Sequence, residues 1–305
     1  MEDRYLGIEI GGTKLQLVVG DEAATILERL RLPVDRARGA PGIRAQIAAA
    51  LPELTARWKI AATGVGFGGP VDGKTGRIAC SHQIEGWSDF PLGAWLGERT
   101  GTPVWVDNDA NVAALGEARR GAGVGFNPVF YVTLGSGVGG GLVVDGKIYH
   151  GASPGESEIG HLRLDRDGTL LEARCSGWAV DAKVRALKNS RATGEGVDRP
   201  SGGEAQWLAS AVPAGDAAAG AILRETAEDL AFGLSHVTHL FHPQVIVLGG
   251  GLSLLGEPWR AAVAGALPRF VMEVFRGGPE VRLASLGEDA VPVGCLLGAR
   301  AHIEH

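Results

Sequence analysis

Alternating apolar positions predict two pairs of strands, and each pair flanks a glycine-rich turn. The first pair covers residues 5–10 and 14–20. The second repeats the arrangement at residues 129–134 and 142–144. A strand pair that recurs with the same kind of turn predicts two related β-rich units in one chain.

Further elements follow each strand pair in a similar order. The remaining predicted strands cover residues 24–33, 60–66, 103–106 and 245–248, and the predicted helices cover residues 42–58, 173–188, 203–212, 216–241 and 291–302. We expect the last helix, which is rich in small residues, to close onto the N-terminal domain. The polar, glycine-containing stretch at about 189–203 is predicted to be a surface loop. This alternation of strands and helices predicts an α/β fold.

The two glycine turns are candidate phosphate sites. They read Gly11-Gly12-Thr13-Lys14 and Gly135-Ser136-Gly137-Val138-Gly139-Gly140-Gly141. Such turns present several backbone N–H groups in a small space, and glycine lets a phosphate approach without meeting a Cβ. The alternative for either turn alone is a β-hairpin that needs a positive φ.

Two polar motifs follow predicted strands. Asn108 and Asp109 stand where a strand ends and an alanine-rich helix begins. A carboxylate in that place can accept a proton from a hydroxyl, whereas the alternative is a helix N-cap without a chemical role. Further along, Glu158 and His161 lie three residues apart around a glycine. This second pair can bond adjacent hydroxyls, and it is informative only together with the other motifs.

Composition narrows the classes of function. The 305 residues are 45% hydrophobic and 21% charged, which is typical of a globular protein with room for two domains. A net charge of −6 and the lack of a long Lys/Arg run argue against nucleic acid as a partner. The three cysteines, Cys80, Cys175 and Cys295, are too widely spaced for a disulfide framework and favour a cytoplasmic protein. We expect neither a signal peptide nor a membrane span.

Six short motifs in one order carry a family resemblance. They are Glu9 to Lys14, Gly66 to Asp72, Asn108 to Asn111, Gly135 to Gly141, Glu158 to His161 and Gly249 to Gly251. The chain resembles, over nearly its whole length, the ROK family of sugar kinases and sugar-responsive repressors. The resemblance implies an actin-like, hexokinase-type α/β fold with two ribonuclease-H-like domains and a central cleft. The implied domains are residues 1–118, with helix 290–305 packed back on them, and residues 119–289; a homodimer is also implied.

The resemblance further implies roles for individual residues in an ATP- and Mg²⁺-dependent kinase of glucose or a related hexose. Asp109 would be the general base that deprotonates the attacking sugar hydroxyl. The residues implied to bind the sugar are Gly68, Gly69, Asn108, Glu158, His161 and Glu172. Those implied to bind the nucleotide are Gly11, Gly12, Thr13, Lys14, Thr133, Gly135, Ser136, Gly137, Gly249, Gly250 and Gly251. Backbone N–H groups, Lys14 and Mg²⁺ would neutralise the transferred phosphoryl group.

Two departures from the family pattern matter. Most members carry a cysteine-rich zinc knuckle directly after the Glu-Ile-Gly-His motif, whereas residues 162–171 contain no cysteine. We therefore expect no structural zinc, and a turn at residues 165–168 in its place. Glu9 stands where the family usually has Asp, which leaves the contact with Mg²⁺ and the phosphate donor less certain. His236, His239 and His242 recur in steps of three near a helix end, where the helix dipole explains them better than a metal does.

Several alternatives stay open at this stage. The sugar could be glucose, mannose, fructose or an N-acetylhexosamine, because these differ by one substituent or epimer. The phosphate donor could be polyphosphate instead of ATP. The rival class is a sugar-sensing regulatory protein with weak or no kinase activity. Because no helix-turn-helix region precedes the first strand, DNA binding is not expected.

Overall fold

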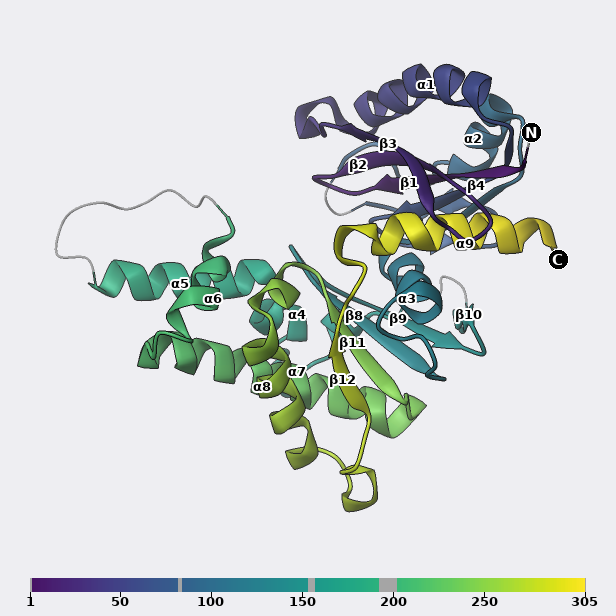
Figure 1. Ribbon diagram of the computed structural model, residues 1–305. Helices are drawn as coiled ribbons and strands as arrows, with labels where there is room; N and C mark the ends of the chain where they lie inside the picture. The colour runs from purple at the N-terminus through teal and green to yellow at the C-terminus, as the bar shows by residue number, and fades with distance from the viewer. Residues whose placement is uncertain (1, 82–83, 153–156, 192–201, 305) are drawn as a thin grey trace. The chain divides into compact units, whose positions relative to one another are not determined.

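The computed structural model describes residues 2–81, 84–152, 157–191 and 202–304 (Figure 1). Its contacts divide the chain into two compact units. Unit 1 comprises residues 1–124, 141–157 and 286–305, and unit 2 comprises residues 125–140 and 158–285. The domain bounds expected from the sequence stay a prediction.

Unit 1 is built on a five-stranded mixed sheet with the strand order β3-β2-β1-β4-β7. Its strands are β1 (Arg4–Ile10), β2 (Leu15–Gly20), β3 (Ile26–Leu32), β4 (Ile60–Phe67) and β7 (Val104–Asn108), and a separate small hairpin is formed by β5 (Val71–Asp72) and β6 (Arg77–Ile78). β1, β2 and β3 are antiparallel, whereas β1, β4 and β7 are parallel. The three parallel strands therefore end at one edge of the sheet.

Four α-helices of the described residues belong to unit 1. They are α1 (Gly39–Arg57), α2 (Leu92–Thr100), α3 (Asp109–Arg120) and α9 (Ala290–Glu304). α9 packs against α3, β1 and β4 (Figure 1). The approach to α3 is close, since a Cβ on Gly294 would lie 1.9 Å from the carbonyl oxygen of Val112. Only glycine fits at that contact, which explains the small residues of this helix.

One core of unit 1 lies between its sheet and the helices α1 and α2. Fully buried Leu6, Ile8, Ile43 and Ile47 belong to it. Trp87 is also part of this core, with an exposed fraction of 1%, and packs edge-on against Phe67 with 5.2 Å between ring centroids. The buried positions of β1 recur at every second residue on this face, as the sequence alternation predicts.

The second sheet is also five-stranded and mixed, with the strand order β10-β9-β8-β11-β12. Its strands are β8 (Val129–Leu134), β9 (Val138–Val144), β10 (Lys147–Ile148), β11 (Val245–Gly249) and β12 (Glu280–Leu283). β11 runs parallel to both β8 and β12. All five residues of β11 are buried, as expected for a central parallel strand.

Most α-helices in the described part of unit 2 lie where the sequence predicts them, but two of the predicted helices are not continuous. They are α4 (Leu171–Cys175), α5 (Gly177–Arg191), α6 (Leu208–Ala211), α7 (Ala217–Phe241) and α8 (Glu257–Ala266). The single helix predicted at 173–188 is divided because Ser176 adopts an extended backbone between α4 and α5. The helix predicted at 203–212 begins instead as a 3₁₀ turn, Glu204–Trp207.

The loop predicted at about 189–203 begins later than expected, because α5 continues to Arg191. Residues 192–201 of that loop lie outside the described residues. The other 3₁₀ segments are Arg36–Arg38, Ile159–His161, Gly251–Leu255, Leu267–Arg269, Glu273–Phe275 and Gly287–Asp289. Among the helices described, none combines the length and the apolar character needed to cross a bilayer.

Candidate functional site

Three sequence motifs meet at the carboxyl edge of the parallel strands in unit 1. β1, β4 and β7 lead there into Gly11, Gly68 and Asp109. The N–H of Gly68 donates to the carbonyl of Ile10 at 2.8 Å. A Cβ on Gly68 would lie 3.4 Å from Oδ2 of Asp109 and 3.6 Å from Cα of Gly11. A carboxylate and two backbone turns thus converge where an α/β sheet usually holds its ligand.

Asn108 is the N-cap of α3. Its Oδ1 accepts from the backbone N–H of Ala110 at 2.8 Å and of Asn111 at 3.3 Å. Its Nδ2 donates to the carbonyl of Gly69 at 3.2 Å. Asn108 therefore caps the helix, which was the alternative to a role in sugar binding. It also connects two positions predicted to bind sugar, its own and that of Gly69. An amide nitrogen carries two hydrogens, so this contact is compatible with a second acceptor.

Asp109 is the first residue of α3, in the turn where a helix favours a negative charge. Its side chain is partly exposed, whereas Asn108 is buried. Gly68 beside it has no side chain to cover the carboxylate. A partly exposed carboxylate on a rigid helix end can accept a proton from a hydroxyl.

The first glycine turn, Gly11 to Lys14, connects β1 to β2. The pairing of Ile10 with Leu15 leaves these four residues as the connection, and the N–H of Gly11 donates to the carbonyl of Lys14 at 2.8 Å. Arg36 donates to the carbonyl of Gly12 at 3.0 Å. Nζ of Lys14 lies 3.6 Å from Oε1 of Glu288. Charged side chains therefore brace this turn.

Glu9 is near the end of β1, before the same turn. Its Oε2 accepts from Nε2 of Gln16 at 2.5 Å. Burial raises the pKa of the Glu9 carboxyl, and the bond from Gln16 acts against that rise. Gln16 in turn accepts from Arg29 at 3.2 Å. The longer side chain at this position is thus held by β2, in a contact that sequence analysis did not predict.

The second glycine turn is shorter than predicted, because β9 already begins at Val138 and leaves only Gly135 to Gly137 as the turn. Backbone groups and Glu172 brace it. The N–H of Gly135 donates to the carbonyl of Gly137 at 3.0 Å, and the N–H of Gly177 donates to the carbonyl of Gly135 at 2.7 Å. Oε2 of Glu172 accepts from the N–H of Val138 at 2.8 Å. Glu172, implied by the resemblance to bind sugar, therefore contacts the predicted phosphate loop.

The motif of Glu158 and His161 packs beside that loop in unit 2. The N–H of His161 donates to the carbonyl of Glu158 at 3.0 Å within a 3₁₀ turn. A Cβ on Gly160 would lie 2.3 Å from the carbonyl oxygen of Val138. The side chains of Glu158 and His161 are both exposed. The backbone of the motif is fixed while its two polar side chains can reach a ligand.

The glycine motif Gly249 to Gly251 begins at the last residue of β11 and packs against the end of β8, next to the second turn. Gly250 has φ +75°, and a Cβ there would lie 2.5 Å from the backbone nitrogen of Leu134. Both the positive φ and the close approach require glycine. Thr133 at the end of β8 pairs with Gly249 across the parallel ladder. The predicted nucleotide residues of unit 2 therefore lie together.

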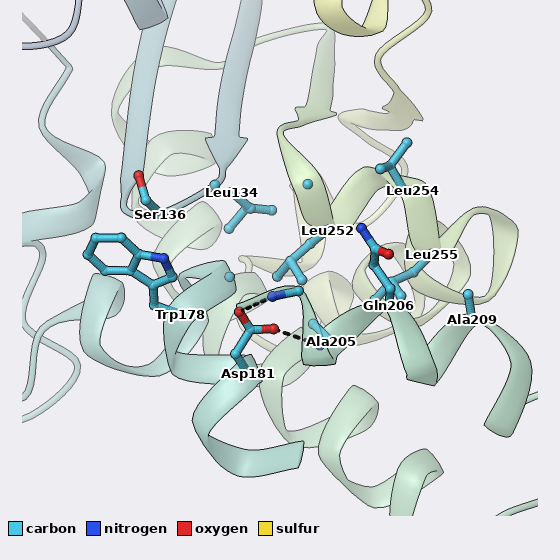
Figure 2. Close-up of a pocket in the computed structure, with 14 residues that line it drawn as sticks. Leu134, Ser136, Trp178, Asp181, Ala205, Gln206, Ala209, Leu252, Leu254 and Leu255 are labelled. Carbon is cyan, nitrogen blue, oxygen red and sulfur yellow. Dashed lines mark hydrogen bonds between the residues drawn. The ribbon is translucent and has the colours of Figure 1, made fainter. Parts of the chain in front are cut away.

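A pocket of about 570 Å³ opens at these strand ends in unit 2, within the range of small-molecule sites. Figure 2 shows Ser136 and the indole of Trp178 on one side, and Gln206, Leu254 and Ala209 on the other. Its other lining residues are Leu134, Gly135, Gly177, Asp181, Gly203, Ala205, Gly251, Leu252 and Leu255. The pocket is mainly apolar and has the second glycine turn at its edge.

The carboxylate of Asp181 supports this pocket. It accepts from the N–H of Gly203 at 2.9 Å and from the N–H of Ala205 at 2.6 Å, as the dashed lines of Figure 2 show. Trp178 is 56% exposed, more than is usual for a tryptophan, and its ring lines the pocket. Sequence analysis missed Trp178 and Gln206, because the helical pattern around each does not show that the two side chains line one pocket.

The segment after His161 forms a hairpin where the family commonly has a zinc knuckle. Arg163 and Leu170 form an antiparallel bridge, and Oδ1 of Asp165 accepts from the N–H of Thr169 at 3.0 Å. The turn predicted at 165–168 is confirmed. In the described part of the chain, no group of three or more His, Cys, Asp or Glu side chains is arranged to hold a metal.

The three spaced histidines of α7 have separate neighbours. Nδ1 of His236 lies 3.0 Å from the carbonyl of Phe232, and Nε2 of His239 accepts from the N–H of Met272 at 3.1 Å. His242 is the C-cap of α7, in the left-handed conformation, with its ring 4.3 Å from that of Phe275. Each imidazole thus serves the packing of the helix end.

Known proteins resemble this chain over nearly its whole length. The sequence matches the ROK family over residues 5–301. The chain belongs to the ROK family. This ROK chain is 33% identical over 312 residues to a glucokinase of Halalkalibacterium halodurans, covering 96% of this chain and 94% of that protein. Its three cysteines are not clustered, so it lacks the zinc knuckle of most family members.

Solved structures of the family share its fold. A ROK family glucokinase from Streptomyces griseus, in complex with glucose and AMPPNP, is 32% identical with a TM-score of 0.83, over 98% of this chain and 99% of that one. A ROK hexokinase from Thermus thermophilus is 30% identical with a TM-score of 0.81, over 99% of each chain. The predicted hexokinase-type, two-domain α/β fold is confirmed. The structure adds that it contains two five-stranded mixed sheets.

Proposed function

We propose that this ROK protein is a kinase that transfers the γ-phosphate of ATP to a hydroxyl of a hexose, with glucose as the first candidate. The observation that carries the proposal is the carboxylate of Asp109 beside Gly68, at the edge where three parallel strands end. The similarity to glucokinases over nearly the whole chain supports the choice of glucose.

Asp109 is the proposed general base. It would take the proton from the sugar hydroxyl that attacks the γ-phosphate, as the carboxylate does in other phosphotransferases. Asn108 would bond a neighbouring hydroxyl through the second hydrogen of its amide, while the backbone of Gly68 and Gly69 would approach the ring. Glu158 and His161, whose side chains are exposed, would bond the remaining hydroxyls.

The pocket of unit 2 is the proposed nucleoside site. A purine is flat and apolar on its faces, and it matches a cavity with an exposed indole and several leucines. The glycine turns at Gly135 and at Gly11 would receive phosphate oxygens through backbone N–H groups, and Lys14 would add a positive charge. Such a pocket favours ATP over polyphosphate, which has no base to place there.

A carboxylate near the first turn fits a role with Mg²⁺. Glu9 is the penultimate residue of β1, and Mg²⁺ commonly binds one or two carboxylates, phosphate oxygens and water. Glu9 would hold the ion together with the phosphates of the nucleotide, whereas Asp109 serves as the base. Bound Mg²⁺ supplies charge neutralisation at the phosphates. The chain itself positions the hydroxyl and accepts its proton.

The proposal is tested by a phosphorylation assay with a panel of hexoses and N-acetylhexosamines, using Mg-ATP and, in parallel, polyphosphate as the donor. We expect turnover of glucose with Mg-ATP, and a loss of about a thousandfold in kcat in Asp109→Asn. Asp165→Asn, in the hairpin after His161, is the matched control and should keep its activity. Sugar binding without any turnover in the wild-type protein would instead support a regulatory protein.

A further inference from the structure

Asp107 is a buried carboxylate directly before the candidate site. It is the penultimate residue of β7, and its side chain is 3% exposed. A buried charge is costly unless hydrogen bonds and an opposite charge compensate it. The contacts of Asp107 must therefore compensate the cost of burying its carboxylate.

Two of its contacts reach the turn that carries the proposed base. Oδ1 of Asp107 accepts from the backbone N–H of Asn108 at 2.8 Å and from Nδ2 of Asn111 at 3.0 Å. These bonds fix the peptide before the N-cap and a side chain in the first turn of α3. Because Asp109 lies between Asn108 and Asn111, the carboxylate of Asp107 sets the direction in which α3 begins.

The third contact comes from a distant segment of unit 1. Nε2 of His150, just after β10, lies 2.6 Å from Oδ2 of Asp107. The imidazole is 42% exposed, whereas its partner is buried. A separation this short is typical of a strong, charge-assisted hydrogen bond, with Nε2–H as the donor. His150 thus closes the side of Asp107 that faces away from Asn108 and Asn111.

The same imidazole also lies near the turn after Gly69. A Cβ on Gly73 would be 3.9 Å from Nε2 of His150. Asn108 is bonded to the carbonyl of Gly69. The histidine is therefore next to both segments that frame the proposed sugar site in unit 1, without belonging to any motif that the sequence singled out.

We propose that His150 is a positioning residue for phosphoryl transfer. It holds the carboxylate of Asp107 in the orientation that fixes Asn108 and the start of α3, and so it aims Asp109 at the sugar hydroxyl. This inference rests on the proposed function. It assigns His150 no proton transfer and no contact with substrate; its effect passes through Asp107.

The chain offers a matched pair of variants. The amide nitrogen of Gln stands as many bonds from the backbone as Nε2 of His, whereas that of Asn corresponds to Nδ1 and is too short to reach Asp107. We expect His150→Asn to lower kcat about ten- to a hundredfold, because small displacements of catalytic groups have effects of that size. The KM for ATP should change less than about twofold, and His150→Gln should recover most of kcat.

Two further readouts separate positioning from a general loss of folding. Asp107→Asn should lower kcat by a similar factor, and adding His150→Asn to it should lower kcat no further, because both remove the same contact. In the NMR spectrum, the Nε2–H proton of His150 should lie far downfield and should shift back in Asp107→Asn. Thermal unfolding of His150→Asn and His150→Gln should occur at similar temperatures.

The outcomes distinguish this inference from the function on which it rests. If the wild-type protein phosphorylates no sugar, the proposed function fails, and the role of His150 fails with it. If the wild-type protein is active and His150→Asn keeps full kcat, only the positioning role is wrong. The positioning role would also be overturned if kcat fell equally in His150→Asn and His150→Gln. The same holds if the effects of His150→Asn and Asp107→Asn on kcat multiplied in the double variant.

Discussion

The two glycine turns read alike in the sequence, yet the structure surrounds them differently. The turn of unit 1, from Gly11 to Lys14, is braced by Arg36 and Glu288 and lies next to Gly68. The turn of unit 2, from Gly135 to Gly137, opens onto an apolar pocket with an exposed tryptophan. Two similar turns therefore lie in different surroundings: the first has charged neighbours, and the second borders an apolar pocket.

This difference suggests a division of labour in the proposed kinase. The first turn shares its unit with Asp109 and Asn108, the residues proposed to prepare the sugar hydroxyl. The second turn shares its unit with the pocket proposed for the nucleoside. Variants in unit 1 should therefore change the rate of transfer, and variants in the pocket should change the affinity for ATP.

Of the variants that compare the two turns, one in the first turn should have the largest effect on activity. Lys14→Ala removes the charged side chain of that turn, and we expect kcat for glucose phosphorylation to fall about a hundredfold, because charge at the phosphates stabilises the transition state. Steady-state kinetics with glucose and Mg-ATP measure it. Lys59→Ala, which removes an exposed lysine paired with Asp3, is the control. A change in KM alone would contradict the division.

A smaller effect is expected in the pocket. Trp178→Ala should raise the KM for ATP about tenfold and leave kcat within about twofold, since it removes a stacking surface but no group that acts on the phosphate. Trp178→Phe keeps an aromatic face and should stay close to wild type. A fall in kcat with an unchanged KM for ATP would contradict the proposal that Trp178 binds the nucleoside.

The smallest effect concerns Glu172, for which the resemblance and the structure suggest different partners. If its bond to Val138 is what matters, Glu172→Ala should raise the KM for ATP about threefold, and Glu172→Gln, which keeps an acceptor oxygen, should not. If Glu172 is a sugar ligand, both variants should raise the KM for glucose instead. Kinetics with each substrate varied in turn decide between the two.

Much of the framework was predictable because it depends on local pattern. The strands around both turns were found from alternation, although β9 begins at Val138 instead of Leu142. Leu6, Ile8 and Ile10 of β1 lie in one core, as the alternation predicts. β12 and α8 were not predicted: β12 has only four residues, too few for a clear period, and α8 follows a glycine without a side-chain cap. The division between α4 and α5 was missed because Ser176 lies in a continuous helical pattern.

The candidate site was predictable only where short motifs mark it. The motif positions meet within each unit, and their roles stay proposals. Trp178, Gln206 and His150 could not be found from the sequence, because their significance comes from contacts with residues far along the chain. The N-cap role of Asn108 was anticipated as an alternative, since Asn before an alanine-rich helix commonly caps it.

The most direct test of the account is the rate of the chemical step in Asp109→Asn, measured in a single turnover with bound glucose and Mg-ATP, alongside glucose affinity by calorimetry. The account predicts that the variant binds glucose within about threefold of wild type while the chemical step slows about a thousandfold. A variant that transfers phosphate within a few-fold of the wild-type rate would contradict the assignment of Asp109 as the base.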